Sequence, residues 1–319
     1  MAILRAQARI DTGRPPIETL DDLEWEIEDE KVVGRRGGTT VILEGDLVLE
    51  GGVPTGVASA LVIRRGLAPL VTIEEIGDRG PVPVDLLFAE IEERGLFAAL
   101  LDGDDEVEGS NGHDRLQGFA GDDVVAGEGG NDHLEGGPGD DTLEGGAGND
   151  RLFGGTGEDE LSGDQGADRL FGGENDDTLL GGAGNDILVG GPGEDVLVAE
   201  EGRDRLSGGS GEDFFVVGGA EWTNEDAPPG VDTILDFDRD EDVLVIGDVL
   251  ADVSDPETDD PAAFVALQAA GSNATKVLID RDGAGDEFQP VLVAVMRGDL
   301  GTDLEDLLAQ EVIRFGPIL

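Results

Sequence analysis

The chain has 319 residues and a formal net charge of −54, because 74 acidic side chains outnumber 20 basic ones. So few basic groups exclude a broad phosphate-binding surface, and we expect no nucleic acid partner. The absence of cysteine excludes disulfides and thiolate metal sites. The large negative charge makes a cation the natural partner of the chain.

Apolar segments are short throughout the chain. No stretch approaches the roughly 18 apolar residues that suggest a transmembrane helix, so we expect no transmembrane segment. Arginine and glutamine interrupt residues 1–16 too often for the apolar core of a signal peptide. Export of the chain would therefore not use an N-terminal signal.

The N-terminal third is expected to form a separate unit. Residues 39–76 alternate apolar and polar side chains between glycines, which predicts β-strands. Residues 84–101 have the apolar spacing of a helix that leads into the following segment. We therefore predict a mainly β head or cap domain over residues 1–99, and its sequence does not indicate a role.

Residues 100–216 contain thirteen consecutive units of nine residues without insertion or deletion. Position eight of each unit is apolar, and position four is glycine in every unit except the one with Asn175. Position six is always aspartate, which gives the candidate metal ligands Asp105, Asp114, Asp123, Asp132, Asp141, Asp150, Asp159, Asp168, Asp177, Asp186, Asp195, Asp204 and Asp213.

The pattern within a unit has a chemical reason. Glycines at positions one, two and four permit a tight turn that brings carbonyl oxygens together. The aspartate adds a carboxylate, and carbonyl and carboxylate oxygens are the ligands that Ca²⁺ prefers. The next three residues form a short strand whose apolar middle side chain points inward.

One unit cannot bury its single apolar side chain. Two units make an 18-residue coil, and stacked coils form two parallel sheets with their apolar side chains between them. The predicted fold is therefore all-β, a parallel β-roll over residues 100–216 in which Asp141 lies near Asp159 and Asp150 near Asp168. This segment has 31 acidic and five basic side chains, so we expect calcium binding and folding to be one event.

The tandem pattern, as in GGAGNDRLF at residues 145–153, resembles the GGxGxDxUx calcium-binding β-roll of RTX (repeats-in-toxin) proteins. The resemblance implies a secreted, extracellular bacterial protein that passes a type I secretion exporter unfolded and folds in calcium outside the cell. It also implies the ligands of each calcium ion. One loop provides its Asp and the carbonyl oxygens of positions two and four, and the loop two units later provides its Asp and the carbonyl oxygens of positions one and three. The two implied sites are Gly137, Gly139 and Asp141 with Gly154, Thr156 and Asp159, and Gly146, Gly148 and Asp150 with Gly163, Gln165 and Asp168.

The repeat pattern is weaker at the two ends of the array. Units 100–108 and 199–207 lack the first glycine, and Ala167 and Arg203 replace the usual polar or acidic residue at position five. We therefore expect the most regular sites between about residues 121 and 198.

Residues 217–319 are predicted to be an α/β C-terminal cap and type I secretion region. DTILDF at 232–237 resembles the strands after the roll in serralysin-like proteins, and residues 276–295 predict a hairpin. Capping signals predict helices over 260–271 and 302–313. The last helix serves as an export signal or as an end cap of the roll.

No catalytic motif is recognisable, so we expect no enzyme. His113 and His133 both lie inside the repeats, and neither His-Glu-x-x-His nor a phosphate-binding glycine loop occurs. The alternative function is an adhesin or polysaccharide-binding accessory module at a cell surface. Its only support is a set of basic side chains at position seven and aromatic side chains at position nine, namely Arg151, Arg169, Arg205, Phe153 and Phe171. The same side chains also fit charge relief between coils.

Overall fold

The computed structural model describes residues 103–217, 230–246, 265–270, 274–279, 291–297, 307–308, 310 and 312–315, and before residue 103 the strands alone. The chain divides into two compact units, residues 1–156 and 157–319, and each is considered by itself.

The first unit begins with an antiparallel sheet in the order β2-β3-β4-β5-β6-β1, and β7 pairs with β5. Its strands confirm the prediction for residues 39–76, and β1 also pairs in parallel with β8, the first strand of the roll. The helix predicted for 84–101 lies outside the described residues. The strands are β1 (Ile3–Ala6), β2 (Glu24–Glu28), β3 (Lys31–Arg36), β4 (Thr39–Glu50), β5 (Val53–Arg65), β6 (Ala68–Glu74) and β7 (Val82–Pro83).

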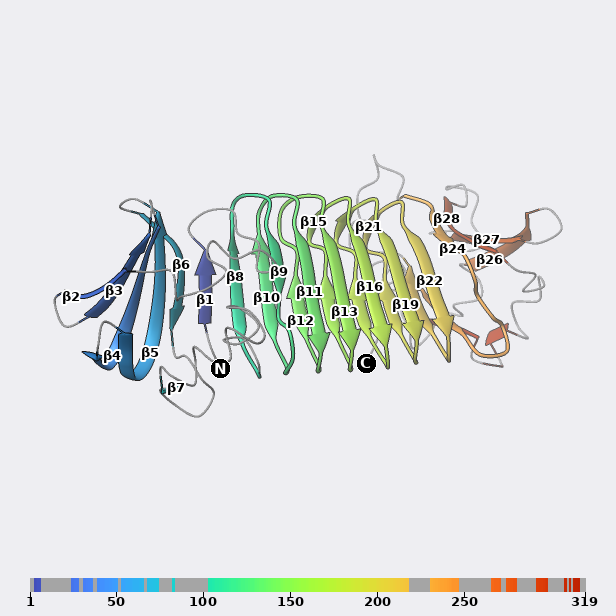
Figure 1. The fold of residues 1–319 in the computed structure, drawn as a ribbon. Coiled ribbons are helices and arrows are strands. Elements are labelled where there is room, and N and C mark those ends of the chain that lie inside the picture. Colours follow the sequence, from blue (N-terminus) through green and yellow to red (C-terminus); the bar gives the residue numbers. More distant parts are fainter. Residues whose placement is uncertain are drawn as a thin grey trace. The chain divides into compact units, whose positions relative to one another are not determined.

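The rest of the first unit is a stack of coils with two parallel sheets (Figure 1). The strands of successive coils pair in a register of 18 residues, as in Val125 with Leu143 and Leu134 with Leu152. This register confirms the predicted 18-residue coil. One sheet holds β8 (Glu106–Ser110), β10 (Val124–Glu128) and β12 (Thr142–Glu144), and the other holds β9 (Arg115–Gln117), β11 (His133–Pro138) and β13 (Arg151–Thr156).

The second unit repeats this arrangement and adds a small third sheet that the sequence did not predict. That sheet is formed by β15 (Gln165–Gly166), β18 (Ala183–Gly184) and β21 (Glu201–Gly202), which lie in the loops along one edge. The two main sheets hold β14 (Glu160–Ser162), β17 (Thr178–Leu180), β20 (Val196–Val198) and β23 (Phe214–Val217), and β16 (Arg169–Glu174), β19 (Ile187–Pro192) and β22 (Arg205–Ser210).

The core lies between the two sheets of each unit. The apolar side chain at position eight is 0% exposed in every repeat, from Val107 to Phe215. Burying one such side chain contributes about 1.5–3 kcal/mol, and the contribution is repeated in each coil. Each unit thus contains an all-β parallel solenoid segment.

The second unit continues the coil stack beyond the predicted end of the array. β24 (Asp232–Ile234) pairs in parallel with β22, and β25 (Val243–Ile246) pairs in parallel with β23. Next to them lie β28 (Val291–Arg297) and β29 (Ile313–Phe315). The side chain of Phe237 covers the core at this end, with its ring 5.7 Å from that of Phe215.

The predicted α/β cap needs correction. The hairpin predicted for 276–295 is confirmed by the antiparallel pairing of β27 (Ala274–Ile279) with β28. The helix predicted for 260–271 is wrong over β26 (Val265–Ala269), because pairing with β27 and burial of Val265 override its local helix signals. Of the predicted helix 302–313, Leu307 and Leu308 are helical, whereas Ile313 begins β29. Among the described residues, no helix has the length and apolarity that crossing a membrane requires.

Candidate metal sites

The constant spacing of the aspartates places them in two columns within each unit, one along each edge of its coils. Each position-six aspartate directly precedes a strand and is at most 4% exposed. In both units its backbone N–H donates to Oδ1 of the aspartate 18 residues later, at 2.7–3.0 Å. We call these bonds the Asp ladder; they join Asp105–Asp123–Asp141 and Asp114–Asp132–Asp150 in the first unit, and Asp159–Asp177–Asp195–Asp213 and Asp168–Asp186–Asp204 in the second.

In part of the ladder, the second carboxylate oxygen has no hydrogen-bond donor. Oδ2 is buried and accepts no hydrogen bond at Asp132, Asp177, Asp186, Asp195 and Asp204. A buried carboxylate without a partner is costly unless it is neutralised, so a cation or a proton must compensate it. Within the described residues, no three acidic or histidine side chains gather into a metal-binding group. Backbone carbonyls would therefore have to complete an oxygen set for Ca²⁺.

Burial changes the acidity of the ladder. It raises the pKa of Asp177 to about 7, and it raises the pKa of Asp132, Asp186 and Asp195 to about 6. Neighbouring ladder carboxylates raise the pKa of Asp177 further, whereas the backbone N–H bonds of the ladder oppose the rise. The ladder is thus arranged to hold protons or metal ions.

The loop glycines provide the space that the carboxylates and carbonyls need. A Cβ on Gly172, at position one, would collide with Oδ2 of Asp177 in its own loop. Gly148, at position four, has a φ of +151°, and a Cβ there would collide with the carbonyl oxygen of Gly130 in the previous coil. Successive loops therefore stack with their oxygens at the edge and with no room for a side chain at these positions.

The structure places the predicted ligands on these two edges. Gly137, Gly139 and Gly146 also have positive φ, as the predicted turns require. The carbonyl of Thr156 in β13 accepts a hydrogen bond from Gly139 N at 2.8 Å. Gly154 also lies in β13, Gly163 precedes Asp168 on a loop, and Gln165 lies in β15. Both implied ligand sets combine residues of the two units, so they stay predictions.

Comparison with known proteins identifies the repeats. The family of the RTX calcium-binding nonapeptide repeat (4 copies) matches residues 101–134, 127–161, 135–170, 153–188, 162–197 and 189–220. Residues 101–220 are RTX calcium-binding repeats that form a β-roll, and the metal of these repeats is calcium. No curated protein matches the chain.

Two solved structures are similar to this chain. The AlgE6R3 subunit of the Azotobacter vinelandii mannuronan C5-epimerase is 25% identical, with 47% of this chain and 78% of that chain covered and a TM-score of 0.33. The AlgE6R2 subunit of the same enzyme is 19% identical, with 67% of this chain and 95% of that chain covered and a TM-score of 0.26.

The RTX roll has ladder members that the sequence reasoning missed as metal-site residues. The N–H of Asp204 donates to Oδ1 of Asp232 at 3.0 Å, and the N–H of Asp213 donates to Oδ1 of Asp242 at 3.2 Å. Both acceptors lie beyond the nonapeptides, and residues 217–229 break the frame of nine. The available signal was the spacing of Gly230, Asp232 and Ile234, which matches positions four, six and eight of a repeat.

Asp114 differs from the other ladder aspartates of the RTX roll. Its Oδ2 accepts hydrogen bonds from the backbone N and from Oγ of Ser110, both at 2.8 Å. Ser110 stands where most repeats have the second glycine. The hydroxyl therefore competes with a cation for this carboxylate.

Several loops of the RTX roll place a side chain where the backbone favours glycine. Glu128, at position two, has a φ of 71°, and Phe119, Asp164 and Glu200 have φ values of 85°, 63° and 62° at the same position. A left-handed conformation costs a residue with a side chain about 1–2 kcal/mol relative to glycine. These loops therefore retain backbone strain.

Relief of this strain is testable at Glu128. We expect Glu128→Gly to stabilise the calcium-loaded protein by about 1 kcal/mol, because glycine adopts positive φ without the steric cost. Denaturant unfolding in excess calcium measures the change. Glu128→Gln is the matched control, since it removes the same charge and keeps the strain; equal stabilisation by both variants would assign the effect to charge instead.

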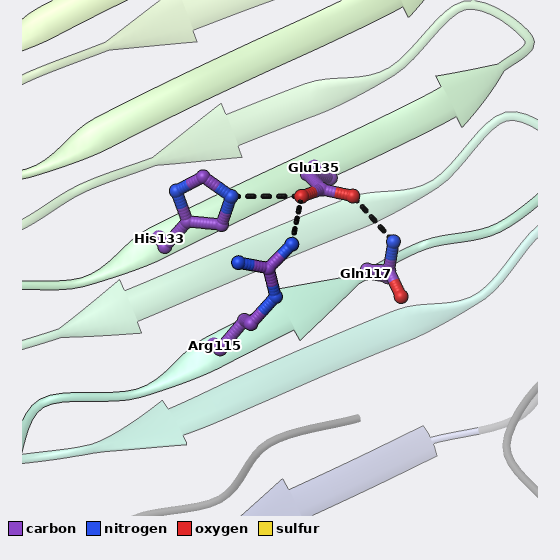
Figure 2. A network of polar contacts seen from close by, with 4 residues as sticks. All are labelled: Arg115, Gln117, His133 and Glu135. Carbon is purple, nitrogen blue, oxygen red and sulfur yellow. Dashed lines mark hydrogen bonds and ion pairs between the residues drawn. The ribbon is translucent and has the colours of Figure 1, made fainter. Parts of the chain in front are cut away.

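The outer face of the RTX roll carries a polar network apart from the aspartate edges (Figure 2). Glu135 accepts hydrogen bonds from Arg115 Nη2 at 2.5 Å and from Gln117, and its Oε1 lies 2.7 Å from His133 Nε2. These side chains come from β9 and β11. The network pairs charges between neighbouring coils, which agrees with the charge-relief interpretation of this face, and the ring of His133 contacts Glu135.

Proposed function

We propose that this protein is an extracellular calcium-binding protein whose RTX roll folds when calcium binds, after export through a type I secretion channel, and that it performs no catalysis. The supporting observation is the Asp ladder. Its buried carboxylates accept N–H bonds through one oxygen, whereas the other oxygen accepts no hydrogen bond at Asp177, Asp186 and Asp195. Ca²⁺ supplies the missing positive charge.

Export and calcium-dependent folding fit this charge arrangement. At low calcium the ladder carboxylates repel one another, which disfavours the compact roll and suits passage through a channel in an unfolded state. At high calcium each filled site stabilises the fold by RT ln(1 + [Ca²⁺]/Kd), about 2.7 kcal/mol when calcium is a hundred times Kd. Several such sites together decide whether the segment folds.

A calcium titration followed by far-ultraviolet circular dichroism tests the proposal. We expect a cooperative gain of β-structure between micromolar and millimolar calcium, because the sites do not exist in the unfolded chain. Magnesium is the control, since it demands a smaller, near-octahedral set of ligands and gives up its waters reluctantly. A roll that is fully formed in chelator at neutral pH would contradict calcium-driven folding.

A second candidate function is binding of an anionic polysaccharide at a cell surface. Arg169 and Arg205 are exposed on β16 and β22, and β19 between them contributes Ile187 in the same register. Two arginines on one face suit carboxylate recognition. Retention of the calcium-loaded protein on an immobilised polyuronate, lost on Arg169→Gln, would favour this function over calcium binding alone.

A further inference from the structure

The segment after the nonapeptides contains one more repeat, hidden by an insertion. Residues 230–235 lie on the coil of residues 202–207, with Thr233 N donating to Asp204 O at 2.8 Å. Ile234 is 0% exposed and occupies the position of an inward leucine. A Cβ on Gly230 would collide with the carbonyl oxygen of Gly202, as at the position-four glycines of the array.

Asp232 stands in this hidden repeat where the array has its metal-binding aspartate. It is 4% exposed, and its Oδ1 accepts the N–H of Asp204 at 3.0 Å. Asp204 is 1% exposed, and its Oδ2 accepts no hydrogen bond. No described basic side chain forms an ion pair with either carboxylate. Two buried aspartates therefore lie in successive coils without a basic partner among the described residues, and their charge requires neutralisation.

The acidity of this pair agrees with its geometry. Burial raises the pKa of both Asp204 and Asp232, and the negative charge of Asp232 raises the pKa of Asp204 further. The two carboxylates thus interact strongly with each other. Such a pair holds either a shared proton or a cation.

The other edge of the second unit also ends in an aspartate beyond the nonapeptides. Oδ1 of Asp242 accepts Asp213 N at 3.2 Å, and its Oδ2 accepts Asp238 N at 2.7 Å. Nearby, Asp236 accepts Gly208 N at 3.2 Å through Oδ1. Backbone donors thus satisfy both oxygens of Asp242, the last ladder carboxylate on this edge.

We propose that Asp204 and Asp232 together bind one further calcium ion, outside the nonapeptide repeats. This inference rests on the calcium-binding function proposed above. The two carboxylates supply the charge, and backbone carbonyl oxygens complete the six to eight ligands that Ca²⁺ takes. Binding there joins the segment 230–246 to the roll, so that this part of the C-terminal region orders only when calcium is present.

The test is the number of calcium ions bound by the full-length protein, measured by equilibrium dialysis. We expect Asp232→Asn to bind one ion fewer than the wild type, because asparagine keeps an acceptor for the Asp204 N–H and loses the charge. Asp204→Asn should bind two ions fewer, because Asp204 would be a ligand of two sites, one shared with Asp186 and one shared with Asp232. Asp240→Asn is the matched control; Asp240 is an exposed acid in the neighbouring turn and should leave the number unchanged.

The outcomes separate this site from the proposed function. If the wild type binds no calcium, calcium binding itself fails. If the wild type binds calcium and Asp232→Asn binds the same number with unchanged affinity, the extra site is wrong and the array sites stand. If Asp232→Asn does not fold in calcium, Asp232→Glu takes its place, because glutamate keeps the charge but moves the carboxylate. A loss of calcium affinity of at least about tenfold at one site supports the proposal, and unchanged affinity overturns it.

Discussion

Replacing Gly148 with alanine is expected to destabilise the calcium-loaded roll by about 3–5 kcal/mol. The added Cβ collides with the carbonyl oxygen of Gly130, and a φ of +151° is unfavourable for any residue with a side chain. Backbone strain of this kind costs about 1–3 kcal/mol, and forced displacement of packed neighbours costs about as much again. Alanine keeps the carbonyl group, so the substitution tests space in the coil stack and leaves the predicted ligand atom in place.

Gly129→Ala is the matched control for this prediction. Gly129 lies in the same stack, but a Cβ there would be 3.5 Å from Asn111 Oδ1 and 3.8 Å from Ala147 O, which are ordinary contacts. Ala147 already occupies the equivalent position of the next coil on this edge. We expect a change of less than about 0.5 kcal/mol in guanidinium unfolding with excess calcium. Equal stability of the two variants would show that the coils do not approach as closely as described.

Mild acid is expected to replace calcium in part. In chelator, lowering the pH from about 7.5 to about 5.5 should increase the β-signal in circular dichroism, because the folded ladder binds protons that the unfolded chain has released. The pKa of Asp177 is about 7 in the fold, and that of Asp132, Asp186 and Asp195 is about 6, all above the ordinary value of 3.8. Their contribution to metal-free stability is fully present below pH 3.8 and is lost as the pH rises through 6 to 7.

Two controls separate this effect from general charge reduction. High salt at about pH 7.5 screens exposed charges and leaves buried carboxylates ionised, so it should induce less structure than acid. In the presence of calcium the direction reverses, since protons compete for the ligands and calcium affinity should fall by up to about tenfold per pH unit for each competing carboxylate. A metal-free β-signal that stays constant or decreases in acid would contradict the prediction.

The frame of nine predicted the roll because its chemistry is local and repeated. Position eight is apolar in every repeat, and each of these side chains is buried, as for Leu134 and Leu188. The aspartate columns follow from the same 18-residue register. The specific calcium ligand sets remain predictions, because the family resemblance supplied them and they combine residues of both units.

Other features depended on distant contacts and were not predictable in the same way. Residues 265–269 have the local signals of a helix, but β27 offers a pairing edge that only the folded chain provides. Asp232 joins the ladder from 28 residues away, across an insertion that ends the regular frame. The left-handed backbone of Glu128 comes from its place in the coil, which outweighs the preference of glutamate.

The Asp ladder has a direction, because each donor N–H belongs to the earlier coil and each acceptor carboxylate to the later one. The two ends of the roll are therefore not equivalent. Loss of the last coil leaves buried N–H donors of the preceding coil without acceptors, whereas loss of the first coil exposes carboxylates that water readily solvates. The C-terminal neighbour of each coil supplies the acceptors for its N–H groups. A roll that grows from its C-terminal end toward its N-terminal end therefore adds each new coil to acceptors already in place, and removal of the last coil is more harmful than removal of the first.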